Sequence, residues 1–253
     1  MEISVLSSGS HGNSIYLGNN GSGLLFDVGI TNKDICNRLS LIDKSIENIK
    51  GVFISHEHAD HVRGLNVCSQ KNDLKIFANK KSMDNYCFPY SYNNILNNQL
   101  YSIAGMKVMP ISVSHDAANT FGFLVKNGTK RVGIFTDLGF VNDEVKKIIG
   151  NVDSLVLESN HDYDMLENGR YPFHLKERIK SKFGHLSNFD TGIAVMENAS
   201  PRLKNVFLAH LSENNNRKDI AMETFEAFIN ERKDLDINVS MTDQKEPTSL
   251  RDI

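Results

Sequence analysis

The sequence predicts an α/β fold in which two β-sheets pack face to face and helices cover their outer surfaces. Short apolar runs that are too β-branched for helices, such as Gly51-Val-Phe-Ile, occur in both halves of the chain. In each half these runs come first and helical patterns follow, and the order restarts near Lys107. The 253 residues, 40% of them apolar, suffice for one large domain. We therefore expect a single domain over residues 1–242 and a polar, unstructured C-terminal tail over 243–253.

The first half is predicted to begin with strands joined by a hairpin. The segment Asn19-Asn-Gly-Ser-Gly is typical of a hairpin turn. The expected strands are 3–6, 13–17, 24–27 and 51–54. The expected helices are 32–41 and 62–71. Residues 80–99, in which tyrosines lie among several asparagines, are expected to be irregular.

The second half supplies the other sheet and most of the helices. Its expected strands are 107–114, 120–126, 130–136, 153–158, 205–209 and 236–241. Its expected helices are 141–149, 161–167, 172–183, 188–199 and 217–231. Strands alternating with helices in this way indicate α/β units.

Three histidines and one aspartate lie in the segment Ser55-His-Glu-His-Ala-Asp-His, directly after the strand predicted at 51–54. Imidazole nitrogens and carboxylate oxygens are ligands suited to Zn, Mn or Fe. His56 and His58 point the same way from an extended segment, because side chains alternate along it. Asp60 and His61 follow after the chain has turned, so they can face a second metal ion. Chelation explains three histidines here, whereas a merely solvated loop does not require them.

Three further strand-like runs also lead to a histidine or an aspartate. These residues are His115, Asp137 and His210. Open sheets place their binding sites at the carboxyl ends of the strands. We therefore expect the three side chains to complete the centre that the 56–61 segment begins.

The His-x-His-x-Asp-His signature, followed in order by these three residues, resembles the metallo-β-lactamase superfamily over residues 3–211. The resemblance implies a four-layer αββα sandwich and two divalent metal ions. One ion would be held by His56, His58, His115 and Asp137. The other would be held by Asp60, His61, His210 and the bridging Asp137.

Other segments are similar to the YycJ/WalJ branch of that superfamily. They are Leu6-Ser-Ser-Gly-Ser-His-Gly-Asn-Ser, Glu158-Ser-Asn-His-Asp, Gly184-His-Leu-Ser-Asn and His210-Leu-Ser-Glu-Asn-Asn-Asn. This likeness implies 5′-to-3′ exonuclease activity on double-stranded DNA. His11 departs from the pattern, because a small residue is expected there.

The expected chemistry is hydrolysis of a phosphodiester. Two divalent cations would make the cleft electropositive although the chain carries a formal charge of −3. A water between the ions would lose a proton near neutral pH and attack as hydroxide. We take Asp60, a ligand, as catalytic, and His185 as the group that assists the leaving 3′-oxygen. His185 could instead be only a loop residue near a helix cap. His161 is a further catalytic candidate that could equally support a ligand or cap a helix.

Polar and basic side chains near these segments are candidate contacts to phosphate. A tight turn near the N-terminus and the start of the helix at 188 would offer backbone N–H groups, although both could be purely structural. A basic run between Arg170 and Lys182 could be a nucleic-acid track or simply a solvated face. The candidates are Ser8, Ser10, Asn13, Asn160, Ser187, Asn188, Lys176 and Lys180.

The rest of the composition indicates a cytoplasmic protein. Cys36, Cys68 and Cys87 are odd in number and fit free thiols in a reducing compartment. The N-terminus shows no secretory pattern, and no apolar run approaches the ~20 residues that span a bilayer. These features give no reason to expect a membrane partner, and the resemblance implies double-stranded DNA with a 5′ end as the partner.

Two other functions stay open on the sequence alone. An ester or thioester hydrolase of the glyoxalase II or lactonase kind could use the same ligands, because a scaffold does not fix its substrate. A metal-stabilised binding protein without turnover is the other alternative, although a structural zinc site is normally closed and four-coordinate. The segments at 158–162 and 184–188, with the basic run between them, favour the nuclease.

Overall fold

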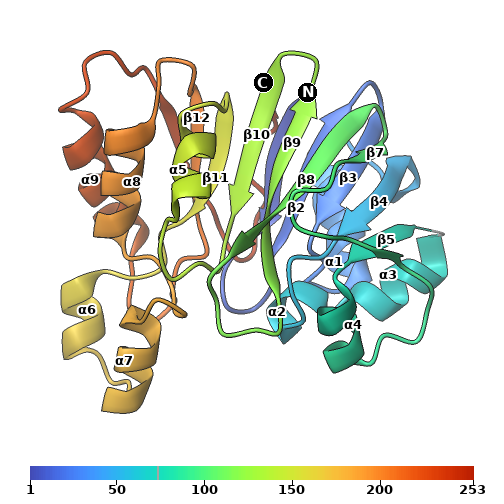
Figure 1. Cartoon of the computed structure of the whole chain (residues 1–253), viewed down its shortest axis with the longest axis horizontal. Coiled ribbons are helices and arrows are strands. Elements are labelled where there is room, and N and C mark those ends of the chain that lie inside the picture. The colour runs from blue at the N-terminus through green and yellow to red at the C-terminus, as the bar shows by residue number, and fades with distance from the viewer. Residues whose placement is uncertain (73) are drawn as a thin grey trace.

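In the computed structural model, which describes residues 1–72 and 74–253, the chain forms two seven-stranded sheets (Figure 1). The strands of the first sheet are β1 (Glu2–Ser7), β2 (Ser14–Asn19), β3 (Ser22–Phe26), β4 (Ile49–Phe53), β5 (Lys75–Ala78), β6 (Asn93–Asn94) and β14 (Arg251–Asp252). Those of the second are β7 (Tyr101–Ile103), β8 (Met106–Val113), β9 (Thr120–Asn127), β10 (Lys130–Phe135), β11 (Ser154–Glu158), β12 (Asn205–Ala209) and β13 (Asn238–Met241). The strand orders are β14-β1-β2-β3-β4-β5-β6 and β13-β12-β11-β10-β9-β8-β7.

Helices cover the outer face of each sheet. They are α1 (Asn32–Leu41), the 3₁₀ helix η1 (Ile46–Asn48), α2 (Ala59–Val62), α3 (Leu65–Asn72), α4 (Lys80–Tyr86), α5 (Asp143–Ile149), α6 (Tyr163–Asn168), α7 (Phe173–Lys180), α8 (Asn188–Asn198) and α9 (Lys218–Ile229). Apolar side chains of α1, α3 and α4 share a core with the first sheet, and those of α5, α8 and α9 with the second. Helices α6 and α7 extend beyond the sandwich at one end (Figure 1). The predicted αββα sandwich is confirmed.

The central core lies between the two sheets and consists largely of aromatic side chains. Phe53 stacks on Phe26 and on Phe77, with ring centroids 5.6 Å and 4.5 Å apart, and Phe123 of the opposite sheet meets Phe26 at 5.1 Å. Strand side chains alternate between this core and the helix-covered faces, so the inner strands are buried on both sides. That double burial explains why their sequences are continuous apolar runs.

The C-terminal residues are ordered, so the prediction of an unstructured tail is wrong. Strand β14 pairs antiparallel with β1, with Glu2 opposite Asp252. The Thr248 hydroxyl accepts a hydrogen bond from the amide of Val5 at 3.0 Å. These are backbone and polar contacts with the other end of the chain, so the polar composition of the segment gave no sign of them.

Two predictions for the first half also need correction. The region 80–99 is not irregular throughout, because Asn79 caps α4 by accepting a hydrogen bond from Lys81 N at 2.9 Å. The helix predicted over 62–71 is instead divided into α2 and α3. Gly64 causes the division: its N–H donates to Val28 O at 2.8 Å, and a Cβ there would lie 2.2 Å from Ile30 O.

Parallel strands bring the functional loops to one end of the sandwich. Strand β4 runs parallel to β3 and β5, and β11 runs parallel to β10 and β12. The carboxyl ends of these strands therefore lead into neighbouring loops. Within the described part of the chain, no helix is both long enough and apolar enough to cross a bilayer.

Candidate metal centre

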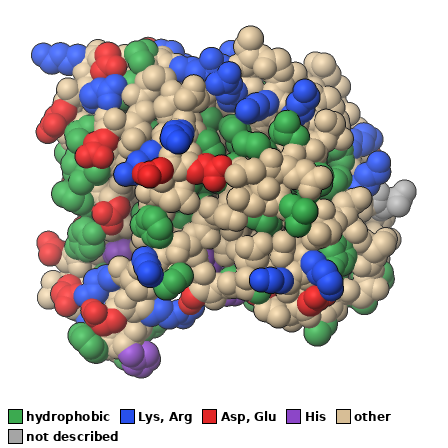
Figure 2. Space-filling model, viewed as in Figure 1, with side chains coloured by type: hydrophobic (Ala, Val, Ile, Leu, Met, Phe, Trp, Pro, Cys, Tyr) green, Lys and Arg blue, Asp and Glu red, His purple; other side chains and the backbone are tan. Residues whose placement is uncertain are grey.

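One cavity of about 260 Å³ lies at this end of the sandwich and collects residues from both halves of the chain. Figure 2 shows histidine surface inside a hollow between the part of the molecule over α6 and α7 and the rest. The lining residues that were expected as metal ligands are His58, Asp60, His115, Asp137 and His210. The structure thus brings together side chains that lie far apart in the sequence.

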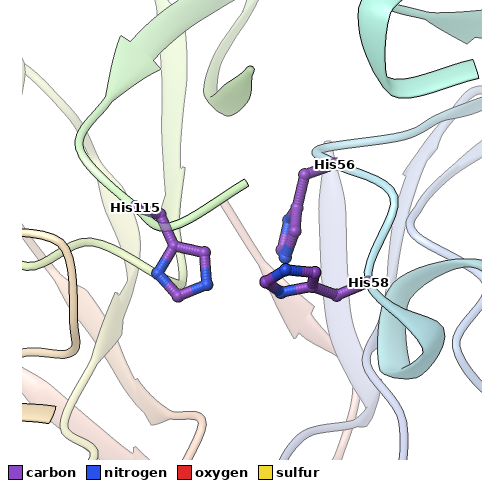
Figure 3. A group of neighbouring side chains, drawn as sticks. All are labelled: His56, His58 and His115. Atoms are coloured by element: carbon purple, nitrogen blue, oxygen red, sulfur yellow. The ribbon is translucent and has the colours of Figure 1, made fainter. Parts of the chain in front are cut away.

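Two groups of donor atoms face each other in this region. His56, His58 and His115 form one group, whose rings converge across a gap (Figure 3). The rings of His56 and His58 are 4.5 Å apart, and each is 5.2 Å from that of His115. The second group consists of Asp60, His61 and His210. Within each group the potential ligand atoms lie within 4.8 Å of one another.

Asp137 lies between the two groups. Its Oδ2 is 3.1 Å from His61 Nε2, and its Oδ1 is 3.9 Å from His115 Nε2. The side chain is buried, so the carboxylate is aimed at the centre and not at bulk water. Asp137 is therefore within reach of both groups.

Four of the histidines are oriented by a partner that holds Nδ1. The partners are Ser55 Oγ for His56 (2.9 Å), Asp27 Oδ2 for His61 (2.8 Å), Gly184 O for His115 (3.1 Å) and Glu158 Oε1 for His210 (2.8 Å). In each ring Nε2 is left for the centre of the site. Metal-binding histidines are characteristically oriented in this way through their other ring nitrogen.

The donor set fits divalent cations. His56 Nε2 and His210 Nε2 are buried and have no hydrogen-bond partner among the described residues, which is costly without a ligand. Burial lowers the pKa of His61, but Asp137, Asp27 and Asp60 together raise it well above its usual value. The buried carboxylates therefore require positive charge, and bound cations would supply it.

Three residues of the site have left-handed backbone conformations. Asp27, Asp137 and His210 each follow a strand and have φ values of 60°, 55° and 56°. A positive φ is uncommon outside glycine and costs about 1–3 kcal/mol where it is strained. Each turns the chain sharply at the end of its strand, so the side chain enters the centre.

Sequence reasoning missed two residues of this arrangement, Asp27 and Glu158. Asp27 holds Ser55 as well as His61, and Glu158 Oε1 lies 2.8 Å from Nδ1 of both His185 and His210. Both carboxylates are buried, and each stands at the end of an apolar strand. The same signal predicted Asp137, so it was available for these two residues as well.

His185 lines the cavity beside the metal-binding groups. Its Nδ1 is 3.7 Å from Asp137 Oδ1 in addition to its contact with Glu158. About 21% of the His185 side chain is accessible, whereas the imidazole of His210 is almost fully buried. Because Nδ1 is held from behind, Nε2 is the ring nitrogen available to a substrate.

His161 is not among the residues that line the cavity. It is buried, and neither ring nitrogen has a hydrogen-bond partner among the described residues. Its ring lies 5.7 Å from that of Tyr163, an edge-to-face contact. Burial lowers the pKa of His161 to about 4, although Glu158 acts in the opposite direction.

Most of the polar side chains expected to bind phosphate are buried around the centre. Asn13 donates from Nδ2 to Asp60 Oδ2 at 3.2 Å, and Ser8 Oγ accepts from His210 N at 2.7 Å. Ser187 caps α8, and Asn188 donates to Asn216 Oδ1 at 2.9 Å. These four residues hold the loops in place, and none of them lines the cavity.

Ser10 and Asn160 do line the cavity. The cavity residue from the basic run is Arg178, which also pairs with Asp116. Lys180 pairs with Glu167 and Glu177, at 3.1 Å and 2.7 Å. Lys176 donates to the carbonyl of Glu167. The two lysines therefore lie on a face of α7 other than the one that meets the cavity.

The chain is similar to known proteins over most of its length. A model of the beta-lactamase superfamily domain matches residues 25–206. The chain is 34% identical to the exodeoxyribonuclease YycJ of Bacillus anthracis, over 99% of this chain and 98% of that protein. It is 33% identical to the exodeoxyribonuclease WalJ of Streptococcus pneumoniae, over 95% of this chain and 91% of that protein.

Solved structures share the arrangement of the two sheets. The metallo-beta-lactamase fold protein YhfI from Bacillus subtilis superposes with a TM-score of 0.74 at 14% identity, covering 98% of each chain. The short form of human tRNase Z superposes with a TM-score of 0.66 at 16% identity, covering 98% of this chain and 99% of that one. At these identities the similarity concerns the fold alone.

Proposed function

The chain belongs to the metallo-β-lactamase superfamily of metal-dependent hydrolases, and on this basis we propose that it is a 5′-to-3′ exonuclease acting on double-stranded DNA. The proposal draws support from two relatives named exodeoxyribonuclease that match nearly the whole chain. The observation that carries it is that members of both donor groups, Asp137 and His185 line the same cavity. The proposal also includes a cytoplasmic location, in which the protein would encounter DNA with a free 5′ end.

The two donor groups fit two divalent cations, one at each. His56, His58 and His115 would hold one ion, Asp60, His61 and His210 the other, and Asp137 would contact both. When bound, such ions would activate water and offset charge on the phosphodiester. Nitrogen and carboxylate ligands of this kind accept Mn, Zn or Fe.

In this proposal His185 delivers a proton to the leaving 3′-oxygen. Glu158 accepts a hydrogen bond from Nδ1–H. Burial lowers the pKa of His185, but Glu158 raises it above its usual value, so the protonated ring would carry a second proton on Nε2 beside the cavity. Transfer of this proton as the P–O3′ bond breaks would release a nucleoside 5′-monophosphate and leave a 5′-phosphate on the shortened strand. Arg178, which also lines the cavity, would contact the phosphate.

The test is a digestion assay with linear duplex DNA that carries a labelled 5′-phosphate. Wild-type protein with Mn²⁺ should release labelled mononucleotide progressively. Asp60→Ala should not, because the second donor group loses its carboxylate. Asp143→Ala is the matched control, since that side chain is 92% exposed in the first turn of α5 and lies away from the cavity.

Three results would overturn the proposal. They are digestion from the 3′ ends only, seen as labelled oligonucleotides of decreasing length, equal activity of Asp60→Ala, and absence of cleavage with Mn²⁺, Zn²⁺ or Mg²⁺ in protein shown to bind the metal. The last result would favour the ester and thioester hydrolases that use the same scaffold.

A further inference from the structure

The cavity has a second wall that the metal chemistry does not use. Tyr171, Leu175 and Ile179 line the cavity together with the histidines and aspartates. Leu175 and Ile179 are four residues apart in α7 and therefore share one face of the helix, and Tyr171 lies just before the helix begins. All three side chains are half-buried. The wall is apolar and directed at the reacting centre.

Helix α7 leaves this face available. None of its eight residues is buried, so the helix does not place its apolar side chains in a core. Leu175 and Ile179 instead border the cavity that holds the donor groups. An apolar face next to the polar donor groups is complementary to a ligand that is charged at one end and apolar at the other.

The ring of Tyr171 is held in place before any ligand binds. Its hydroxyl accepts a hydrogen bond from Asn214 Nδ2 at 3.1 Å. Asn214 belongs to the loop that follows His210, so the bond ties the aromatic wall to a loop of the metal centre. A fixed, partly exposed ring of this kind is suited to stacking on a nucleobase.

We propose that Tyr171, together with Leu175 and Ile179, binds the base of the 5′-terminal nucleotide after that base has left the duplex. The inference rests on the proposed exonuclease function and adds which form of the substrate enters the cavity. A base that enters the cavity to contact Tyr171, Leu175 and Ile179 leaves its partner in the complementary strand. Unpairing costs a few kcal/mol, and contact with the wall offsets it. The substrate is then an unpaired terminal nucleotide on a duplex.

The test compares two duplexes with a one-nucleotide 5′ overhang, so that pairing of the terminal base does not enter. One overhang is a normal thymidine and the other is an abasic tetrahydrofuran nucleotide. Wild type should show a kcat/KM about 5- to 100-fold lower for the abasic end, the range expected for one stacked base. Tyr171→Ala should cleave both ends at the slow, abasic rate.

Two further variants separate stacking from a general effect on folding. Tyr171→Phe retains the ring and should retain the preference for the normal base. Phe173→Ala removes a ring that is 76% exposed in the same helix and does not line the cavity, so it should behave as wild type. Melting temperatures of all variants identify any loss of structure.

The possible results can be told apart. The inference is wrong if wild type does not distinguish the two ends, or if Tyr171→Ala still distinguishes them. It is also wrong if Tyr171→Phe loses the preference as completely as Tyr171→Ala. If wild type releases nucleotides from neither duplex, the proposed function itself has failed.

Discussion

The two walls of the cavity are built in opposite ways. On the metal side, donor side chains come from loops at strand ends, and four histidines are each fixed by a partner at Nδ1. On the other side, α7 buries none of its residues and meets the cavity with half-exposed side chains. Hydrogen bonds from buried partners therefore orient the metal side, whereas the wall that we propose binds the base belongs to an exposed helix. Variants in each wall can test this difference.

The largest effect is expected for His58→Ala, in the metal wall. Loss of this ligand should lower metal content and reduce DNA cleavage by about 10³-fold or more, because bound cations supply several kcal/mol to such reactions. His58 is only half-buried, so the metal-free variant should melt close to metal-free wild type. Metal analysis and calorimetry on both proteins provide the measurement.

The matched control is His174→Ala, which removes an exposed histidine of α7. It should retain metal and activity. Wholesale unfolding of His58→Ala would mean that the centre is structural, and the contrast between a reactive and a selective wall would then be lost.

The second-largest effect is expected in the free energy of unfolding. It concerns His161, which lies between the metal wall and α6. Burial lowers the pKa of His161 to about 4, against about 6.5 in an unfolded chain. Between these values the unfolded state binds more protons, so this contribution to stability is present above pH ~6.5 and is lost as the pH falls towards ~4. The full loss is about 3 kcal/mol. His161→Gln should remove it from the pH dependence of urea unfolding, and an unchanged dependence would show that His161 does not titrate in this way.

A smaller effect is expected for Glu158→Gln, which keeps the size of the side chain but removes its charge. His185 and His210 would both lose the carboxylate that holds Nδ1. Partners of this kind typically contribute 10- to 100-fold to metal affinity or activity. Titration with Mn²⁺ and measurement of kcat would separate the two contributions. Glu226→Gln, an exposed change in α9, is the control, and an effect no larger than that of the control would show that the contacts are incidental.

The same contrast explains what the sequence could predict. The clustering of the candidate ligands was predictable because strand-ending histidines and aspartates are visible locally and parallel strands carry them to one edge. Glu158 and Asp27 carry the same signal, but their role appears only in contact with histidines 52 and 34 residues away. The pairing of β14 with β1 likewise depends on the far end of the chain. The face of α7 that meets the cavity follows from where the helix docks, which its own charges do not determine.

The smallest predicted effect tests which face of α7 contacts DNA. Arg178 lines the cavity, whereas Lys180 is engaged by Glu167 and Glu177 on another face of α7. If DNA passes along the cavity side, Arg178→Ala should reduce the slope of log K against log salt for duplex binding by about 1, and Lys180→Ala should leave it unchanged. Fluorescence anisotropy between about 50 and 200 mM salt would detect this as a change of about fourfold in relative affinity. Equal effects of the two variants would place DNA across the outer face of the helix, as the lysine spacing in the sequence suggests. The apolar wall would then have to bind a DNA 5′ end that reaches the cavity from the opposite side of α7.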